Sequence, residues 1–372
     1  MARARVVIDG RCLGARPTGV ARWTGNLFCG LSRLDAAGRM DWVVLRDPKA
    51  EWPEAVAEGV AGLGADVLEV AGAFHSPKGW PSVVRAVEGV GGDWLLTPDA
   101  FSPVWGRFQR ATVIHDAIPV TQAAHLRGSK KSRIPGLWRG WLWMQGLRAD
   151  RVLTVSRHSA RTLARVAGVR GSKLAVVGNA VAPPEGVGVR RAEQEPAWLL
   201  YVGRRDPYKN VPMLVRVVHE LRERGVAARL AVVGPADPRY PEAEQEAQRL
   251  GLGADAVCFA GGVSEDELEA WYARASAVVL PSLAEGFGLP AVESMARGVA
   301  VACATGSGLA EAVGSAAVTI DPRDQGAWVE GLAPLLGDAG LRARLAEAGR
   351  GRAARFTPER QARRVLRALG LG

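Results

Sequence analysis

The stretch Glu285-Gly-Phe-Gly-Leu-Pro-Ala-Val-Glu293 decides the fold predicted for this chain. The apolar run 277–280 precedes it and is typical of a buried parallel strand. Apolar residues at helical spacing follow it: Val292, Met295, Ala296 and Val299. The stretch is therefore predicted to be a loop that joins a strand to a helix, which is the repeating connection of a parallel α/β sheet.

The same loop has the residues of a binding site for an anion that carries hydroxyl groups. Gly286 and Gly288 let the backbone approach a ligand, and Pro290 is tolerated at a helix start because its missing N–H has no partner there. The free N–H groups of a first helical turn attract an anion. Glu285 and Glu293 add hydrogen-bond acceptors on either side. A nucleotide sugar, with its phosphates between hydroxyl-bearing groups, suits this arrangement.

The spacing of the two glutamates resembles the E-x7-E signature of the retaining family 4 glycosyltransferases, also called glycosyltransferase group 1. The resemblance continues through 294–301, 308–311 and 321–322. It implies an α/β protein of the GT-B architecture, in which two Rossmann-like domains with parallel sheets face each other across a cleft. Two glutamates on an ordinary helix would be only a solvated surface, so their place in this loop makes the pattern specific.

The length of the chain predicts more than one domain. A chain of 372 residues exceeds one ordinary core and favours two domains of about 180 residues each. Residues 184–196 are rich in Gly, Pro and charge without periodicity and are the expected linker. The resemblance implies an acceptor-side domain, a donor-binding domain and a last helix that crosses back to the first: residues 1–183, 197–358 and 359–372.

Strands and helices are predicted to alternate along both halves, as a parallel sheet requires. The first strand of the second half is expected at 198–202. Those of the first half are expected at 5–9, 42–46, 66–70, 94–97, 111–115, 151–155 and 173–177.

Composition indicates a globular chain without a membrane span or a disulfide framework. The hydrophobic share is 48% and the mean hydropathy is +0.01. No window approaches 18 uninterrupted apolar residues, and a strand begins at once near the N-terminus, so neither a span nor a secretion signal is expected. The cysteines show no C-x-x-C spacing, which predicts neither disulfides nor a zinc site in a cytoplasmic protein: Cys12, Cys29, Cys258 and Cys303.

The formal net charge of +10 is concentrated in the first half. Residues 1–183 contain 25 Lys and Arg against 14 Asp and Glu. Such an asymmetry indicates a face that meets a polyanion, which could be anionic lipid, nucleic acid or a phosphorylated acceptor. The alternative is that Arg is simply the favoured surface residue of this chain, with no partner implied.

Two positions in the first half are assigned to the active site by the resemblance. Thr18-Gly19-Val20 follows the strand 5–9 and resembles the loop that approaches the donor phosphates, which makes Gly19 a donor-binding residue. His115 closes the run 111–115 at the carboxyl end of a strand, where open α/β sheets bind ligands, and resembles a hydrogen-bonding residue beside the donor sugar. The alternative for His115 is a cap on neighbouring backbone. The other histidines are expected at surface or structural positions: His75, His125, His158 and His219.

The segment 127–144 combines cationic residues with three closely spaced tryptophans: Trp138, Trp141 and Trp143. Tryptophan favours the headgroup zone of a bilayer and cations attract anionic lipid, so the segment fits contact with a membrane surface. A core helix with Trp138 and Trp141 on its buried face is the alternative. Single-stranded nucleic acid would use the same residue types and is not expected as a partner.

A second motif follows the strand 198–202. Gly203-Arg204-Arg-Asp-Pro-Tyr-Lys209 resembles the G-R-x4-K clamp with which the family holds the donor diphosphate. A strand-to-helix turn puts both cations within reach of one anion at a helix start. Arg205 is a competing candidate, and Arg204 is preferred because it directly follows Gly203. Ordinary surface charge is the alternative.

The chain contains no D-x-D metal motif, no G-x-G-x-x-G fingerprint and no GK[ST] loop, so a site without a metal or a resident cofactor is predicted. The counter-charge for a departing diphosphate would come from Arg204, Lys209 and the helix start after Gly288. The resemblance assigns the other roles. Glu285 accepts hydrogen bonds from the donor sugar and Glu293 holds the ribose. The backbone near the phosphates is that of Phe287, Gly288 and Leu289.

The predicted function is a retaining glycosyltransferase that moves a hexose-type sugar from GDP-mannose or a UDP-sugar to a glycan, lipid-linked or natural-product acceptor, as in polysaccharide biosynthesis. The resemblance implies that a donor phosphate oxygen helps to take the acceptor's proton. Two glutamates in one loop and helix do not suit a glycosidase. An epimerase, hydrolase or phosphorylase on the same scaffold, or a relative that only binds sugar nucleotides, is the alternative. The enzyme is expected in the cytoplasm, with the inner face of the plasma membrane as the open choice.

Overall fold

The computed structural model describes residues 3–14, 18–34, 38, 40–126, 135–181 and 197–372 of the chain. The chain divides into two compact units. Unit 1 comprises Met1–Val120, Ile134–Ala182 and Phe356–Gly372. Unit 2 comprises Thr121–Arg133 and Pro183–Arg355. The expected linker 184–196 and the cationic stretch 127–134 lie outside the described residues.

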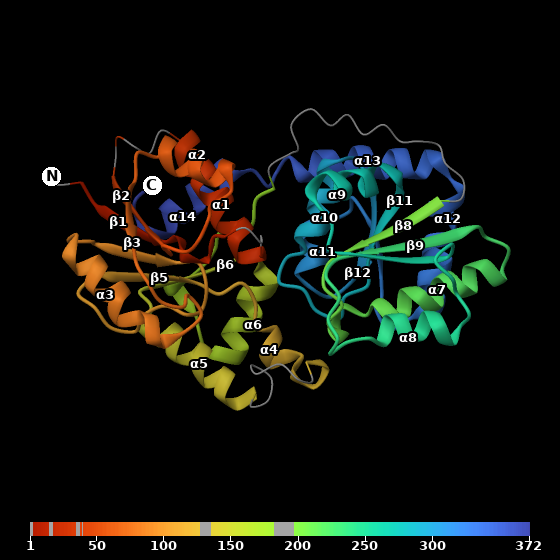
Figure 1. Cartoon of the computed structure of the whole chain (residues 1–372), viewed down its shortest axis with the longest axis horizontal. Helices are drawn as coiled ribbons and strands as arrows, with labels where there is room; N and C mark the ends of the chain where they lie inside the picture. Colours follow the sequence, from red (N-terminus) through yellow and green to blue (C-terminus); the bar gives the residue numbers. More distant parts are fainter. Residues whose placement is uncertain (1–2, 15–17, 35–37, 39, 127–134, 182–196) are drawn as a thin grey trace. The chain divides into compact units, whose positions relative to one another are not determined.

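Unit 1 is built on a seven-stranded parallel sheet (Figure 1). Its strands are β1 (Arg5–Asp9), β2 (Asp41–Arg46), β3 (Asp66–Glu69), β4 (Trp94–Thr97), β5 (Gln109–Val113), β6 (Arg151–Thr154) and β7 (Leu174–Val176). They run in the order β3-β2-β1-β4-β5-β6-β7. The direction of winding reverses between β1 and β4, so the loops after these two strands part to opposite sides of one edge.

Helices connect the strands of unit 1. They are α1 (Gly19–Arg33), α2 (Glu54–Gly62), α3 (Trp80–Gly89), α5 (Pro135–Arg148) and α6 (Arg157–Ala167), with short 3-10 turns η1 (Gly10–Cys12), η3 (Pro77–Gly79) and η5 (Gly171–Lys173). Helix α4 (Ile118–Thr121) lies at the boundary between the two units, and η4 (Ala123–His125) follows it.

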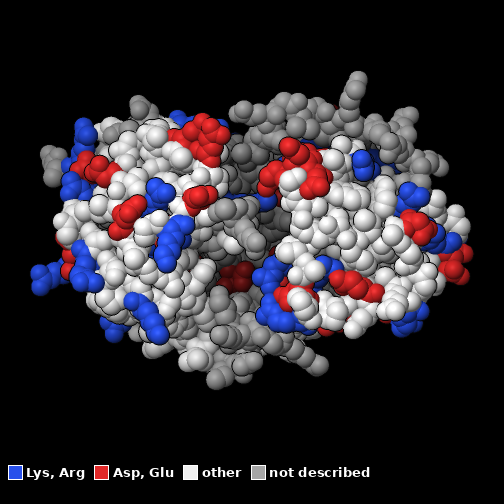
Figure 2. Space-filling view, in the orientation of Figure 1, with Lys and Arg blue, Asp and Glu red and all other residues white. Residues whose placement is uncertain are grey.

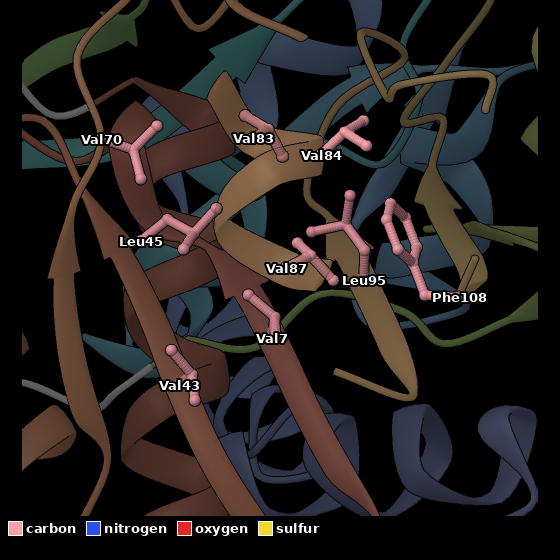
Figure 3. Close-up of a cluster of buried hydrophobic side chains, with 9 residues drawn as sticks. All are labelled: Val7, Val43, Leu45, Val70, Val83, Val84, Val87, Leu95 and Phe108. Carbon is pink, nitrogen blue, oxygen red and sulfur yellow. The ribbon is translucent and has the colours of Figure 1, made fainter. Parts of the chain in front are cut away.

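The core of unit 1 forms where α3 packs on the sheet. Apolar side chains of β1, β2 and β4 meet three valines of the helix, as Figure 3 shows. The cluster consists of Val7, Val43, Leu45, Val70, Val83, Val84, Val87, Leu95 and Phe108. The central strands β1, β2 and β4 are buried along most of their length, so their sequences are nearly continuous apolar runs instead of alternating patterns.

The end of the chain belongs to unit 1. Helix α14 (Pro358–Leu369) packs against α1, and the contact is close because Gly30 has no side chain. A Cβ at Gly30 would lie 2.0 Å from the carbonyl oxygen of Pro358. Gln361 Nε2 also donates a hydrogen bond to the carbonyl of Trp23 at 3.1 Å.

Unit 2 contains a six-stranded parallel sheet in the order β10-β9-β8-β11-β12-β13 (Figure 1). The strands are β8 (Ala197–Val202), β9 (Ala228–Val233), β10 (Val257–Gly261), β11 (Ala275–Leu280), β12 (Ala300–Ala304) and β13 (Val318–Ile320). The helices are α7 (Val211–Glu223), α8 (Glu242–Arg249), α9 (Glu265–Arg274), α10 (Leu289–Ala296), α11 (Gly308–Val313), α12 (Gln325–Gly337) and α13 (Ala339–Ala353), with the turn η6 (Pro207–Lys209).

The prediction of an α/β protein with two Rossmann-like parallel sheets is confirmed. Within the described residues, no helix is both long and apolar enough to cross a membrane. Lys and Arg side chains are interspersed with Asp and Glu over each unit on the face drawn in Figure 2.

Candidate active site

The topology of unit 2 marks one edge of its sheet as the place for a ligand. Strands β8 and β11 are neighbours, but the chain leaves them in opposite directions, towards β9 and β12. A crevice is expected outside the carboxyl ends of two such strands. The loops that follow them are in contact, because the N–H of Leu283 donates to the carbonyl of Tyr208 at 2.7 Å.

Lys209 and Glu285 meet at this edge. Lys209 Nζ donates to Glu285 Oε1 at 2.6 Å, and Ser282 Oγ donates to the same oxygen at 3.0 Å. The two charged side chains are only 17% and 14% exposed. Burial lowers the pKa of Lys209, but the carboxylate of Glu285 and two neighbouring tyrosines outweigh it and hold that pKa above its ordinary value. The ammonium group is therefore charged in a place that is largely shielded from water.

Arg204 and Arg205 point to different environments although they are adjacent. The side chain of Arg204 is 59% exposed, and its guanidinium donates to both carboxylate oxygens of Asp206, at 2.9 and 3.0 Å. Arg205 is buried, with its guanidinium paired to Glu244 and lying 5.5 Å from the ring centre of Phe259. Arg204 is thus the accessible cation of the two.

The turn that carries Arg204 is held by close backbone contacts. Gly203 has a φ of 151°, and its N–H donates to the carbonyl of Val233 at 2.9 Å. A Cβ at Gly234 would lie 2.0 Å from the carbonyl oxygen of Gly203, so this second position also requires glycine. The hydroxyl of Tyr201 donates to the carbonyl of Arg204, and burial raises the pKa of that phenol above its ordinary value. The turn is therefore fixed before any ligand arrives.

The loop between β11 and α10 is fixed in the same way. Gly288 has a φ of 95° and lies directly before the helix, where a Cβ would come within 2.3 Å of Leu309. Gly308, at the start of α11, donates its N–H to the carbonyl of Glu285 at 3.0 Å. A Cβ at Gly308 would lie 2.1 Å from the carbonyl oxygen of Gly286. The start of α11 therefore lies so close to the loop that only glycine fits at position 308.

Helix α10 begins at Leu289, so Pro290 is its second residue instead of the first. An N–H at that position has no bond within the helix either, so the proline is still tolerated. The side chains of Phe287 and Glu293 are buried, and Leu289 is half-buried. Of residues 287–289, only Leu289 at the helix start is partly exposed.

The eight unit 2 residues predicted from the sequence form one group around the ends of β8 and β11: Gly203, Arg204, Lys209, Glu285, Phe287, Gly288, Leu289 and Glu293. The two others, Gly19 and His115, belong to unit 1. Gly19 is the exposed first residue of α1, and a Cβ there would meet nothing described within 4 Å. The helix start therefore does not need glycine for packing reasons.

His115 lies two residues beyond β5, which ends at Val113 and not at His115 as predicted. Its ring nitrogen Nε2 is 3.0 Å from the carbonyl oxygen of Pro98, at the end of the neighbouring strand β4. The ring also meets Trp23 edge to face, with 5.8 Å between centres. His115 is thus held at the carboxyl edge of the unit 1 sheet.

Sequence reasoning missed the groups that orient the cations and the carboxylate. Asp206 binds Arg204, and Ser282 donates to Glu285. Both lie within three residues of a predicted site residue, so their polar side chains were a usable signal. Asp99 and His75, which form a pair in unit 1, lay outside every motif.

In chemical terms, the edge of unit 2 can hold an anion and hydrogen-bond a hydroxyl beside it. The loops after β8 and β11 carry one buried ammonium bound to a carboxylate, one accessible guanidinium and a helix start. Within the described part of the chain, no three His, Cys, Asp or Glu side chains gather as a metal site. Metal independence stays a prediction for chelation to test.

Comparisons with known proteins agree with this chemistry. Residues 188–352 match the family model described as glycosyl transferases group 1. The D-inositol 3-phosphate glycosyltransferase of Salinispora arenicola is 35% identical over 179 residues, which cover 46% of this chain and 40% of that protein. The protein of the same name from Acidothermus cellulolyticus is 33% identical over 225 residues, covering 56% of this chain and 50% of its own. The chain thus spans about half the length of the curated relatives it matches.

Solved structures resemble the whole chain. A sucrose-phosphate synthase from Thermosynechococcus elongatus has a TM-score of 0.74 at 19% identity, with 99% of this chain and 98% of that chain covered. The Anabaena protein Alr3699/HepE, solved in complex with UDP and glucose, has a TM-score of 0.73 at 18% identity, with 99% and 100% covered. At these identities the likeness establishes the fold, and the two sheets described above are those of a GT-B protein.

Proposed function

We propose that this chain, whose residues 188–352 match the glycosyl transferases group 1 family, moves a sugar from a nucleoside-diphosphate sugar to a hydroxyl-bearing acceptor with retention of configuration. The observation that carries the proposal is the buried Lys209–Glu285 pair that joins the loops after β8 and β11, with the accessible Arg204 on the same loop as Lys209. Cations at the carboxyl ends of β8 and β11 suit a diphosphate, and a carboxylate among them suits a sugar hydroxyl. Residues 197–358 would form the donor domain and 1–183 the acceptor domain, linked by 184–196, with 359–372 completing the first domain.

The proposed chemistry depends on holding charge that develops as the sugar leaves. When the bond between the anomeric carbon and the phosphate oxygen breaks, negative charge collects on the diphosphate. Lys209, Arg204 and the N–H groups at the start of α10 would stabilise it, oriented before the reaction begins. Arg204 would exchange part of its contact with Asp206 for the phosphate. His115 would act from unit 1 on the donor sugar, and Gly19 would let backbone approach the phosphates.

Glu285 has a role that follows from its two oxygens. Oε1 already accepts hydrogen bonds from Lys209 and Ser282, and Oε2 accepts none from the described residues. We assign Oε2 to a hydroxyl of the donor sugar. Glu293, one turn into α10, would hold the ribose, and Phe287 would keep the loop against the protein.

The donor we propose is a UDP-sugar or GDP-mannose, and the acceptor is a glycan, a lipid-linked sugar or a small natural product. Support for a UDP-sugar comes from the fold, which is shared with a protein solved with UDP and glucose. Support for a polyol or sugar acceptor comes from relatives named for D-inositol 3-phosphate. No metal and no resident cofactor are proposed.

The test begins with the donor. Thermal unfolding is measured with UDP, GDP, ADP and dTDP and with their sugars, and one nucleotide is expected to raise the midpoint more than the others. Release of that nucleotide from its sugar is then measured with and without acceptors. Faster release with an acceptor, together with a glycosylated product, supports transfer. A free or rearranged sugar alone would mean a hydrolase or epimerase, and binding without turnover across a broad acceptor panel would mean a binding protein.

We also propose that helix α5 touches an anionic membrane from the cytoplasmic side. Its Trp138 and Trp141 are half-buried and pack against Phe101, whereas Trp143 is 55% exposed. Two leucines and two arginines share the exposed surface: Leu137, Leu147, Arg139 and Arg148. Exposed apolar residues flanked by cations are typical of an interfacial helix. The cationic residues Lys130, Lys131 and Arg133 lie outside the described residues.

Sedimentation with vesicles tests the membrane proposal. The double variant W143A/L147A is compared with the wild type on vesicles that contain or lack phosphatidylglycerol. Binding that requires the anionic lipid and falls in the variant is expected. Equal sedimentation of both proteins on both kinds of vesicle would mean that α5 is only a partly exposed helix of unit 1.

A further inference from the structure

A histidine and an aspartate form a pair at the carboxyl edge of the unit 1 sheet, outside the residues assigned above. His75 Nδ1 lies 2.8 Å from Asp99 Oδ2. Asp99 follows β4 by two residues, and its side chain is 16% exposed. His75 lies in the loop between β3 and η3, and its side chain is 55% exposed. One group is therefore largely shielded and the other is open to solvent.

A buried ion pair holds the loop that carries His75. Arg11 forms two hydrogen bonds to Asp9, at 2.7 and 2.8 Å, and both side chains are almost fully buried. A third bond runs from Arg11 NH1 to the carbonyl of Gly72 at 3.2 Å. Burying two charges costs solvation free energy, so such a pair is weak evidence for stability and better evidence for positioning. Here the pair positions the loop.

Glycines allow this loop to lie close to the arginine. Gly72 has a φ of 126°, which other residues rarely adopt. A Cβ at Gly79 would lie 3.0 Å from the carbonyl of Ala73 and 3.3 Å from Arg11 NH1. The path of the chain on both sides of His75 is therefore determined by its contacts and not only by its length.

The imidazole of His75 is also oriented by aromatic rings. Phe74 and Phe101 meet it edge to face, with ring centres 4.8 and 5.7 Å away. When Nδ1 carries the proton that it donates to Asp99, Nε2 presents a lone pair. Nε2 has no hydrogen bond to any residue that the structure describes. An oriented histidine with one nitrogen tied to a carboxylate and the other open is the arrangement that binds a hydroxyl proton in catalytic triads.

The His75–Asp99 pair and His115 contact adjacent residues of one turn. Nε2 of His115 contacts the carbonyl of Pro98, and Pro98 immediately precedes Asp99. Both histidines are therefore held by one turn after β4, at the point where the winding of the sheet reverses between β1 and β4. This is the edge at which open α/β sheets bind ligands.

We propose that His75 is the residue that binds the reacting hydroxyl of the acceptor, with Asp99 as its positioning residue. The proposal rests on the transfer function proposed above and adds the acceptor side to it. Nε2 accepts the hydrogen bond of the hydroxyl, and no covalent bond changes at the imidazole. The guanidinium of Arg11 is already bonded to Asp9 and Gly72, so what the pair offers a ligand is the lone pair of Nε2 on an imidazole backed by the carboxylate of Asp99. These groups suit a neutral sugar or polyol hydroxyl and disfavour a phosphate.

Kinetics with matched variants test the role. His75→Ala and His75→Gln are compared with His125→Ala, an exposed histidine with no assigned role. With UDP-glucose or GDP-mannose as donor, kcat/KM for the acceptor should fall about 10- to 100-fold in the His75 variants, the loss expected for a hydrogen bond at a substrate. Donor KM and nucleotide release without acceptor should be unchanged. Imidazole in the buffer should restore part of the activity of His75→Ala but not of Asp99→Ala.

Equal acceptor kcat/KM in wild type and His75→Ala would overturn the proposal, as would a parallel loss of donor binding, which would indicate a structural role. A measurement without donor separates this result from failure of the transfer function. Saturation-transfer NMR with methyl α-D-glucopyranoside, methyl α-D-mannopyranoside and myo-inositol should give a signal that His75→Ala loses and His125→Ala keeps. No signal from any of the three with the wild type would also overturn the proposal. A wild type that binds no nucleotide sugar would instead contradict the proposed function.

Discussion

The two units place different chemistry on the same kind of sheet edge. In unit 2 the ends of β8 and β11 bring together a buried ammonium, an accessible guanidinium and a helix start. In unit 1, His115 follows β5 and the His75–Asp99 pair joins the loops after β3 and β4, whereas Arg11, which follows β1, is paired with Asp9. The cations of the first edge suit an anion, and the second edge is the one proposed for a neutral hydroxyl. In each unit the topology marks the edge, and the side chains determine which ligand would suit it.

The edges also differ in how they are made rigid. In unit 2, glycines at 203, 234, 288 and 308 let backbone segments touch, so the loops support one another directly. In unit 1, a buried ion pair holds the loop through one carbonyl. Substitutions at the unit 2 edge should therefore act mainly by steric contact or lost charge, and those at the unit 1 edge by lost hydrogen bonds.

The largest effect is expected from Lys209→Ala, which removes the buried cation from unit 2. The variant loses a pre-oriented charge next to the departing diphosphate, and kcat should fall about 100- to 1,000-fold, the range seen when one such donor is removed. Turnover is measured as nucleotide release with the donor identified by thermal shift. Lys49→Ala, an exposed lysine in unit 1, is the control and should keep wild-type activity. Wild-type turnover in Lys209→Ala would remove this residue from the clamp.

Adjacent arginines provide the next comparison. Arg204→Ala should lower kcat/KM about 10- to 100-fold, because its accessible guanidinium would contact the ligand, and should also cost about 1–3 kcal/mol of stability, because the buried carboxylate of Asp206 loses both hydrogen bonds from it. Arg205→Ala should leave kcat/KM near the wild-type value and cost about 1–3 kcal/mol of stability, because the partly exposed Glu244 loses its buried partner. Activity and thermal unfolding are measured on both. If Arg205→Ala loses activity and keeps its stability, Arg205 and not Arg204 is the arginine that binds the diphosphate.

A smaller effect is expected from Gly308→Ala, which tests steric support of the loop. The added methyl group would lie 2.1 Å from the carbonyl oxygen of Gly286, a backbone atom that cannot move away cheaply. Unit 2 should lose about 1–3 kcal/mol of stability, as for an overpacked site. Gly19→Ala is the control in unit 1, because its methyl group would meet nothing described within 4 Å. Equal thermal unfolding midpoints for the two variants would mean that the close contact between α11 and the loop does not exclude a methyl group at position 308.

The sequence predicts the sheets because their strands are buried on both faces. Runs such as 277–280 are apolar at every position and cannot be placed at a surface, so alternating strands and helices are enough to derive two parallel sheets. The loop 285–293 is predictable for a related reason, since its glycines and proline constrain the backbone locally. Local constraints of this kind need no knowledge of the rest of the fold.

Contacts between residues that are far apart in the sequence cannot be predicted from such local constraints. His75 and Asp99 are 24 positions apart in different loops, and nothing in either loop indicates the other, so the sequence predicts only a surface or structural position for His75. The contrast between Arg204 and Arg205 depends on which side of the turn faces Glu244, 39 positions later. The tryptophans of α5 pose the same problem, because one helix leaves Trp138 and Trp141 half-buried and Trp143 exposed. Composition fits membrane contact there, with a core helix as the alternative.

The smallest effect is expected from chelation, which tests whether the cations of unit 2 act without a divalent ion. If the cations of unit 2 supply the counter-charge for the diphosphate, a divalent ion has no place to fill between Lys209 and Arg204. EDTA should then leave turnover unchanged in the wild type, measured at constant ionic strength so that screening of these charges does not change. Mn²⁺ or Mg²⁺ added back should have no effect either. A reproducible loss with EDTA that Mn²⁺ restores would mean that the anion-binding edge is incomplete without a metal, and that the protein's own cations only assist it.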